Sequence, residues 1–203
     1  GILQMQNEKK KSQVRRLTIS AVMIALASVL SLIKVYELPL GGSITLMSMV
    51  PIILLSVMFG VKWGMFSAFV YSVIQFIFGA VIDGLFAWGL NWYSLIGCIA
   101  LDYLIAFSVL GPAGLWRKHG TVGIVAGTAF AMLLRFLSHF TSGVVLFANM
   151  DEFVAFGASW IGHPYLYSLA YNGSYMLPEL IITCIAAAII FNLPQVKKLI
   201  AKV

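Results

Sequence analysis

The stretch Lys9-Lys-Lys-Ser-Gln-Val-Arg-Arg-Leu-Thr-Ile-Ser-Ala-Val-Met-Ile-Ala-Leu-Ala-Ser-Val-Leu-Ser-Leu-Ile-Lys-Val-Tyr36 decides the fold class of this chain. A polar, basic segment comes first and a long apolar run follows. A helix of about 20 apolar residues crosses a hydrocarbon core about 30 Å thick. The stretch therefore predicts a transmembrane helix over residues 17–36, preceded by a basic tail over residues 1–16. The tail is too long and too charged for a cleaved signal peptide, so we expect the first helix to be retained.

Five further apolar segments follow, over about 44–61, 63–82, 93–115, 120–147 and 165–193. The whole chain is 61% hydrophobic and 10% charged, whereas soluble domains carry about 25% charged residues. Backbone groups in lipid must be hydrogen-bonded within their own segment, so each span should be a helix. We therefore predict an all-α integral membrane protein, with one transmembrane domain over residues 1–203 and six transmembrane helices.

The charges predict the orientation. Eleven lysines and arginines fall on one side of a six-span topology: Lys9, Lys10, Lys11, Arg15, Arg16, Lys62, Arg117, Lys118, Lys197, Lys198 and Lys202. The connections on the other side hold mainly acids: Glu37, Asp83, Asp151 and Glu152. Basic loops stay inside, so the N-terminal tail and the C-terminus are predicted to be cytoplasmic. Anionic lipid head groups account for the net charge of +6, and no nucleic-acid partner is expected.

Aromatic residues gather at the predicted outer end: Trp88, Trp92, Tyr93, Phe147, Phe153, Phe156, Trp160, Tyr165 and Tyr167. One interpretation is the aromatic belt of a membrane interface. A belt should appear at both interfaces, however, and the inner side has mainly Trp63 and Trp116. The excess at the outer end favours a lined pocket that opens to the exterior.

Four ionisable residues fall inside predicted spans: Asp102, Arg135, His139 and Glu179. Each is costly there and needs a partner or a cavity. Counted from the outer ends of their helices, Asp102 and His139 both lie about 12–14 Å deep, as a shared site requires. An alternative is a structural Asp102–Arg135 ion pair. Glu179 follows Pro178 and could accept a backbone hydrogen bond there or meet Arg135.

The last span carries Tyr167, Tyr171 and Tyr175 at intervals of four, which places them on one helix face. Such a stripe is more often packing than binding. Asn172 lies beside it, and its amide needs partners from neighbouring helices or from a ligand. A carboxylate in an aromatic-lined cavity suits a flat cationic ring.

Some features are absent from the sequence. There is no GxxxxGK[ST] phosphate loop, HExxH or GxSxG, so we expect neither ATP hydrolysis nor another enzymatic activity. Both cysteines lie in apolar runs, and we expect no metal site or cofactor. In the first span Ala21 and Ala25 are four residues apart, a spacing that lets a partner helix approach closely. Internal packing is the alternative for this pair.

Several stretches resemble the S-components of energy-coupling factor (ECF) vitamin transporters, and most closely the thiamine-specific family. They are Leu40–Thr45 with Met49–Ile52, Leu101–Leu104, Leu134–Gly143 and Tyr167–Gly173. The resemblance implies capture of thiamine from outside, and ATP-driven uptake with a membrane scaffold subunit, EcfT, and two cytoplasmic ATPase subunits. Ala21 and Ala25 would face that scaffold. The location implied is a prokaryotic plasma membrane.

The resemblance also implies substrate-binding residues: Asp102, Tyr103, His139, Phe147, Tyr167 and Asn172, with Trp92 and Tyr93 at the start of the fourth span. The acid would pair with the thiazolium ring of thiamine. Phe147 stands where the family has tryptophan, and Asp102 stands where a family member has glutamate. The alternatives are an S-component for another vitamin or a thiamine precursor, an intramembrane enzyme, and a stand-alone carrier.

Overall fold

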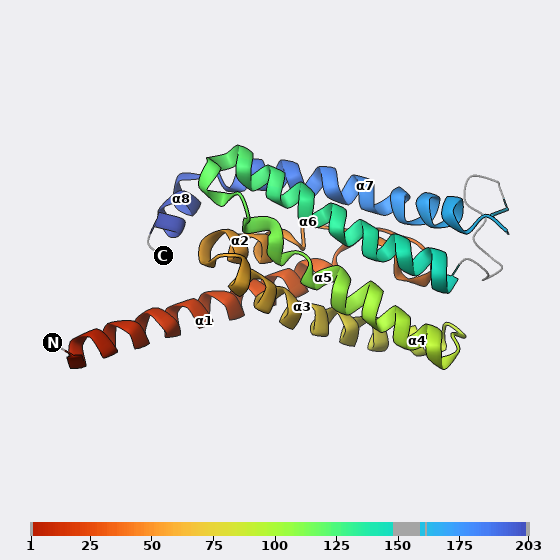
Figure 1. Ribbon diagram of the computed structural model, residues 1–203, viewed down its shortest axis with the longest axis horizontal. Coiled ribbons are helices and arrows are strands. Elements are labelled where there is room, and N and C mark those ends of the chain that lie inside the picture. Colours follow the sequence, from red (N-terminus) through yellow and green to blue (C-terminus); the bar gives the residue numbers. More distant parts are fainter. Residues whose placement is uncertain (1, 148–158, 161, 202–203) are drawn as a thin grey trace.

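The computed structural model describes residues 2–147, 159–160 and 162–201 of the chain, excluding the side chains of 2, 3 and 5. Long helices dominate it (Figure 1). They are α1 (Ile2–Leu32), α3 (Val61–Val81), α4 (Trp92–Cys98) with its continuations η3 (Ile99–Ile105) and α5 (Ala106–Ser108), α6 (Gly120–Ser142) with η6 (Gly143–Phe147), and α7 (Pro164–Ile190). Within the described part of the chain, five segments are long and apolar enough to cross a membrane. The all-α membrane class is thereby confirmed.

The short elements connect these helices. They are the strands β1 (Lys34–Glu37) and β2 (Ser43–Thr45), the helices α2 (Val50–Phe59) and α8 (Pro194–Ala201), and the 3-10 turns η1 (Pro39–Gly41), η2 (Leu85–Ala87), η4 (Gly111–Gly114) and η5 (Arg117–His119). The two strands pair in antiparallel fashion and form a hairpin between α1 and α2.

The segment 44–61 differs from its prediction. Its helix, α2, has 10 residues, and β2 and a bend precede it. At 1.5 Å per residue α2 is about 15 Å long, half the thickness of a hydrocarbon core. Residues 50–58 are all buried, as expected for a helix that is apolar on every side. The count of six transmembrane helices therefore stays a prediction.

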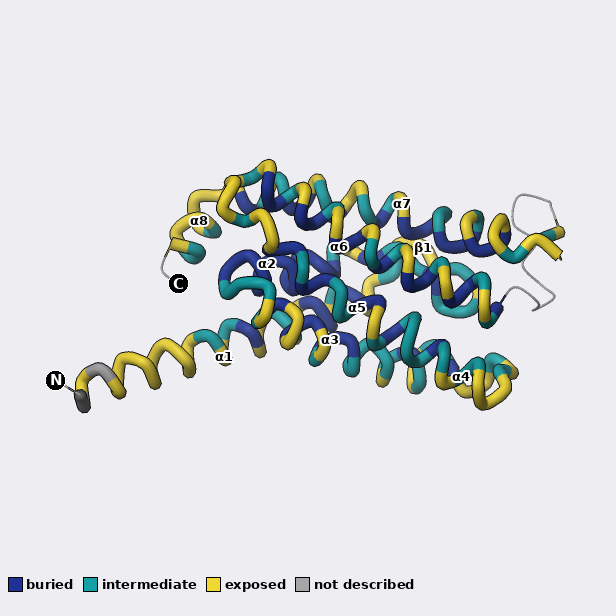
Figure 2. The backbone as a smooth tube through the Cα atoms, viewed as in Figure 1, coloured by how far each residue is buried: buried dark blue, intermediate teal, exposed yellow. Residues whose placement is uncertain are grey.

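Burial follows the pattern of a bundle in lipid. Figure 2 shows dark blue faces turned toward the interior and yellow faces turned outward. Many of the exposed side chains are large and apolar, including Val22, Phe66, Leu133 and Ile181, which are 48–57% exposed. Lipid tails solvate such a surface, whereas water does not, so the burial pattern agrees with the hydropathy.

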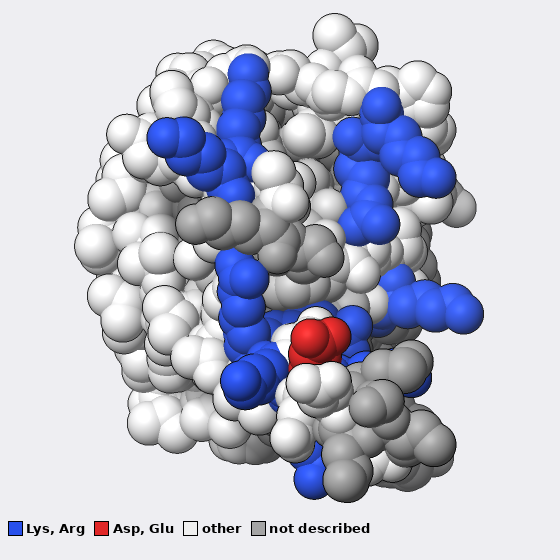
Figure 3. Space-filling model, turned by 90° about the vertical axis from the view of Figure 1, so that its left-hand side faces the viewer, with Lys and Arg blue, Asp and Glu red and all other residues white. Residues whose placement is uncertain are grey.

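The basic residues gather at one end of the bundle. In Figure 1 both ends of the chain, α8 and the α2–α3 turn lie at the left. Figure 3 shows this end face on, with lysine and arginine side chains spread over it and little acidic surface. The grouping expected from the sequence is thus present in three dimensions.

The β1–β2 hairpin is held against α7. The Tyr171 hydroxyl donates to the Pro39 carbonyl and accepts from the Gly42 amide at 3.1 Å. A Cβ atom at Gly42 would lie 2.8 Å from that hydroxyl, so the close approach requires glycine. Further along α7, the Glu179 carboxylate accepts from the Thr45 amide at 2.9 Å and from the Thr45 hydroxyl at 2.7 Å. The hairpin is therefore fixed inside the bundle.

Candidate binding site

A cavity lies between the hairpin, α3, η3, α6 and α7. It has about 970 Å³ of space between atoms, counting the part open to solvent. Its lining includes Lys34, Asp83 and Trp88, which follow α1 and α3 at the ends remote from the basic face. The cavity therefore lies toward the end of the bundle that carries the acidic connections.

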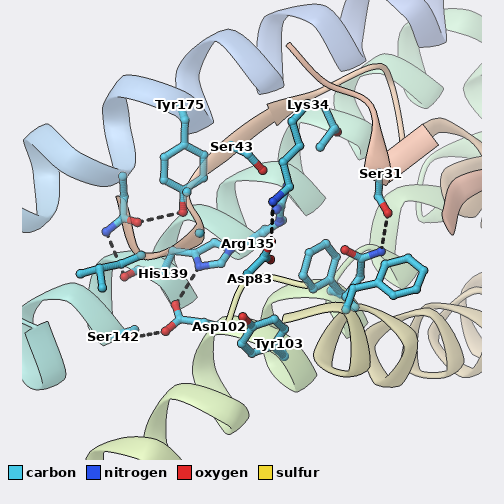
Figure 4. A pocket seen from close by; sticks show the side chains of 18 of the residues that line it. Ser31, Lys34, Ser43, Asp83, Asp102, Tyr103, Arg135, His139, Ser142 and Tyr175 are labelled. Carbon is cyan, nitrogen blue, oxygen red and sulfur yellow. Dashed lines mark hydrogen bonds and ion pairs between the residues drawn. The ribbon is translucent and has the colours of Figure 1, made fainter. Parts of the chain in front are cut away.

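Asp102 and His139 meet in this cavity (Figure 4). The His139 Nδ1 atom lies 2.8 Å from Asp102 Oδ1, and the Ser142 hydroxyl donates to Asp102 Oδ2. The depth match expected from the sequence is confirmed by these contacts. The ion pairs of the described residues do not include Asp102 with Arg135, so the alternative structural pair is not formed.

The contact with Asp102 defines the hydrogen-bonding role of His139. A carboxylate is an acceptor, so the Nδ1 atom of His139 carries the proton that it shares with Asp102. In the neutral ring, Nε2 then presents a lone pair. Nε2 is buried and has no hydrogen-bond partner among the described residues. Because His139 lines the cavity, this atom can accept a hydrogen bond from an N–H or O–H group of a ligand.

The tyrosine stripe of α7 faces the cavity. Tyr167, Tyr171 and Tyr175 all line it, and the rings of the first two are stacked, with centroids 6.0 Å apart. Asn172 connects α7 to α6 by a hydrogen bond: its amide nitrogen donates to the His139 carbonyl at 3.1 Å. The same nitrogen also donates to the Ser168 hydroxyl oxygen at 3.0 Å. Its amide oxygen accepts from the Tyr175 hydroxyl at 3.0 Å. Neighbouring protein groups thus satisfy most of the capacity of Asn172, which leaves an acceptor lone pair for a ligand.

More aromatic rings complete the wall. Trp88 and Phe147 lie edge to face, with centroids 6.5 Å apart, and both line the cavity. Tyr103 lies on η3 directly after Asp102 and packs edge to face against Phe76. Electron-rich ring faces around a carboxylate favour a cation over a neutral molecule.

Arg135 and Glu179 lie deeper and are both buried. The Arg135 guanidinium contacts the Met49 sulfur at 2.8 Å and lies over the Phe107 ring, with its carbon 4.5 Å from the centroid. Of the two alternatives predicted for Glu179, a backbone hydrogen bond or a contact with Arg135, the structure shows a backbone hydrogen bond. The donor is the amide of Thr45 in β2, however, and not a group beside Pro178. Arg135 lines the cavity floor, whereas Glu179 holds the hairpin.

Two predicted site residues lie elsewhere. Trp92 and Tyr93 stack on each other at 3.4 Å between centroids, are 60% and 69% exposed, and do not line the cavity. Both residues lie in the first turn of α4, whereas Asp102 lies further along, on the π-helix η3. The aromatic residues Phe153 and Phe156 lie outside the described residues.

Lys34, Asp83 and Ser142 are among the lining residues that were not predicted as part of the site. Lys34 forms ion pairs of 2.6 Å with both Asp83 and Glu37. Burial opposes the charge of Lys34, but the hydrogen bonds to the two carboxylates outweigh it and raise the pKa of this lysine above 10.5. The spacing of Ser142, three residues after His139 and on a similar face, was the one sequence signal that could have indicated a role.

Known proteins resemble the chain over most of its length. Residues 17–199 match the family described as thiamine transporter protein (Thia_YuaJ). The thiamine transporter ThiT of Bacillus subtilis (strain 168) is 32% identical over 197 residues, which cover 90% of this chain and 93% of that protein. A solved structure of ThiT from Listeria monocytogenes superimposes with a TM-score of 0.69 at 20% identity, covering 91% of this chain and 98% of that one.

Proposed function

The chain belongs to the thiamine transporter protein family, and on that premise we propose that it captures thiamine in the cavity around Asp102 as the substrate-binding subunit of an importer. It is a transporter and not an enzyme. The observation that carries the ligand assignment is the half-buried carboxylate of Asp102 within an aromatic wall. Thiamine carries its positive charge on a flat thiazolium ring, which a methylene group joins to an aminopyrimidine, and this environment favours a cationic ring over a neutral or anionic vitamin.

The proposed site consists of residues that line one cavity: Asp102, Tyr103, His139, Phe147, Tyr167 and Asn172, together with Trp88. Asp102 faces the thiazolium charge, and the rings of Tyr103, Phe147 and Tyr167 cover the flat faces of the ligand. His139 Nε2 accepts a hydrogen bond from the aminopyrimidine. Trp92 and Tyr93 are not part of the proposed site, because their exposed rings lie outside the lining.

The energy for uptake has to come from other subunits, because the sequence has no phosphate-binding loop. We infer a scaffold subunit, EcfT, and two cytoplasmic ATPases as partners in a prokaryotic plasma membrane, with the basic end of the bundle inside. Ala21 and Ala25 are both exposed on α1, so they do not pack within the chain. This exposure supports an outward, partner-facing role for the pair.

The test is a binding titration of detergent-purified protein with thiamine, followed by intrinsic tryptophan fluorescence. Trp88 lines the cavity, so saturable quenching is expected, and it should be lost in Trp88→Phe while calorimetry still detects binding. Riboflavin, folate and biotin serve as comparison ligands in separate assays.

The matched variant is Asp102→Asn, which keeps the size of the side chain and removes its charge. Loss of one partner of a desolvated charge pair should weaken thiamine binding by about 2 kcal/mol or more, which is about 30-fold in Kd. Unchanged affinity in Asp102→Asn would contradict the thiazolium assignment. Tight binding of another vitamin, or of a thiamine precursor, in place of thiamine would keep the importer and change its substrate.

A further inference from the structure

Asp102 lies on an irregular turn. The segment η3 is a π-helix, whose wide turns interrupt the regular hydrogen bonds of an α-helix, and such turns are frequent at functional sites. The Ser138 hydroxyl of α6 donates to the carbonyl of Leu101, the residue directly before Asp102. The backbone at the carboxylate is therefore held by a neighbouring helix as well as by its own.

The same face of α6 holds the carboxylate itself. His139 Nδ1 bonds to Oδ1 at 2.8 Å, and the Ser142 hydroxyl bonds to Oδ2. Each of the two oxygens of Asp102 thus has its own donor, and both donors come from consecutive turns of one helix. Two donors on two oxygens fix the plane of the carboxylate, which a single contact would leave free to rotate.

The Ser142 hydroxyl donates across the helix interface, as the Ser138 hydroxyl does. Hydroxyl groups within helices commonly donate to the carbonyl four residues earlier. Thr141, its exposed neighbour, does so toward the Leu137 carbonyl at 2.8 Å, and Thr128 on the same helix bonds to Ile124 at 2.8 Å. Ser142 is 1% exposed and instead donates across the helix interface to Asp102. Its hydroxyl therefore serves the carboxylate and not its own helix.

From this arrangement we propose that Ser142 is a positioning residue, which orients the Asp102 carboxylate and so sets the preference of the site for cationic over neutral ligands. The proposal rests on the proposed function. A charge that is already oriented needs no reorganisation when a cationic ring enters, so the donor strengthens binding of the cation selectively. A neutral ligand of the same shape gains little from the orientation.

The experiment compares thiamine with a neutral isostere in which a thiophene replaces the thiazolium ring, using calorimetry on detergent-purified full-length protein. In Ser142→Ala the affinity for thiamine should fall about fivefold to tenfold, as expected for loss of a charge-assisted hydrogen bond, while the affinity for the isostere stays within about twofold. Ser142→Thr keeps the hydroxyl and should restore the preference. Thr141→Ala removes an exposed hydroxyl one residue away and should leave both affinities unchanged.

Equal losses for both ligands in Ser142→Ala would assign Ser142 to packing and overturn the proposal, as would no loss for either. If the wild type prefers thiamine in an Asp102-dependent way and Ser142→Ala does not alter that preference, the proposed function stands and this inference fails. Absence of thiamine binding by the wild type would overturn both. If Ser142→Ala does not fold, Ser142→Cys, whose thiol is a weak donor, should lower the preference in the same direction.

Discussion

Replacing Glu179 by leucine should destabilise the hairpin that closes around the cavity. The carboxylate accepts two hydrogen bonds from Thr45, at 2.9 Å from the amide and 2.7 Å from the hydroxyl. Hydrogen bonds to a charged group each contribute about 1.5–3 kcal/mol. The Thr45 hydroxyl keeps Ser48 as a partner at 2.6 Å, whereas the buried amide is left without an acceptor. Leucine also removes the cost of burying a charge, so we expect a net loss of about 3 kcal/mol.

The assay is thermal unfolding in detergent with a thiol-reactive dye. Cys98 is fully buried, so in a Cys184→Ser background, which removes the half-buried second cysteine, reaction with the dye reports loss of the native state. For a chain of this length each kcal/mol shifts Tm by about 2–4 °C, so the expected fall is about 6–12 °C. Glu179→Gln keeps one carbonyl acceptor and should lose about half as much. Ile181→Val changes an exposed residue on the same helix and should change stability by no more than about 0.5 kcal/mol.

The result that would refute this reasoning is a Tm of Glu179→Leu within about 2 °C of the wild type. That outcome would mean that the carboxylate does not hold β2, and that packing alone fixes the hairpin. A fall in Tm that is equally large for Glu179→Gln would instead show that the charge itself, and not the hydrogen-bond geometry, provides the stability.

Lys34 and Tyr103, which line the cavity, and Ala21, on the exposed face of α1, can each be tested by substitution. The pKa of Lys34 is raised, so its ion pairs stabilise the fold fully below its unfolded pKa of 10.5 and lose this effect as pH rises through the folded pKa. The Tm difference between wild type and Lys34→Met should therefore shrink as pH rises above 10.5. A Tm difference that stays constant with pH would show that these ion pairs do not stabilise the fold. A methyl group at Gly79 would lie 2.2 Å from the Tyr103 hydroxyl. Gly79→Ala should therefore cost about 1–3 kcal/mol and weaken thiamine binding by calorimetry, whereas Gly173→Ala, with open space around it, should not. Ala21→Leu should preserve thiamine binding and impair uptake by cells, and loss of binding would show that the Ala21 face of α1 packs within the chain.

Much of the fold class could be read from the sequence. The predicted helices at 63–82 and 120–147 correspond closely to α3 and α6–η6, because a long apolar run is a local property that the bilayer selects directly. The predicted helix at 17–36 overlaps α1 up to Leu32, but Lys34–Tyr36 lie in β1, where pairing with β2 replaces the helix. The meeting of Asp102 with His139 was predicted for a similar reason. Depth in a membrane is counted along each helix, so two residues at equal depth can be matched without knowledge of the packing.

The sequence also determined that one end of the chain's bundle would be basic, since charge is excluded from the spans and must collect at their ends. What it left open were the relations between helices. The rotation of α4 decided that Tyr93 faces outward, and the packing of α6 against η3 decided that Ser142, and not Arg135, joins His139 at Asp102. Residues 44–61 became a strand and a half-length helix, because Glu179 on a distant helix supplies the hydrogen bonds that allow β2 to lie inside the bundle. Hydropathy is summed along the chain, whereas helix rotation and hydrogen-bond partners depend on contacts between segments far apart in sequence, and only the tertiary structure decides these.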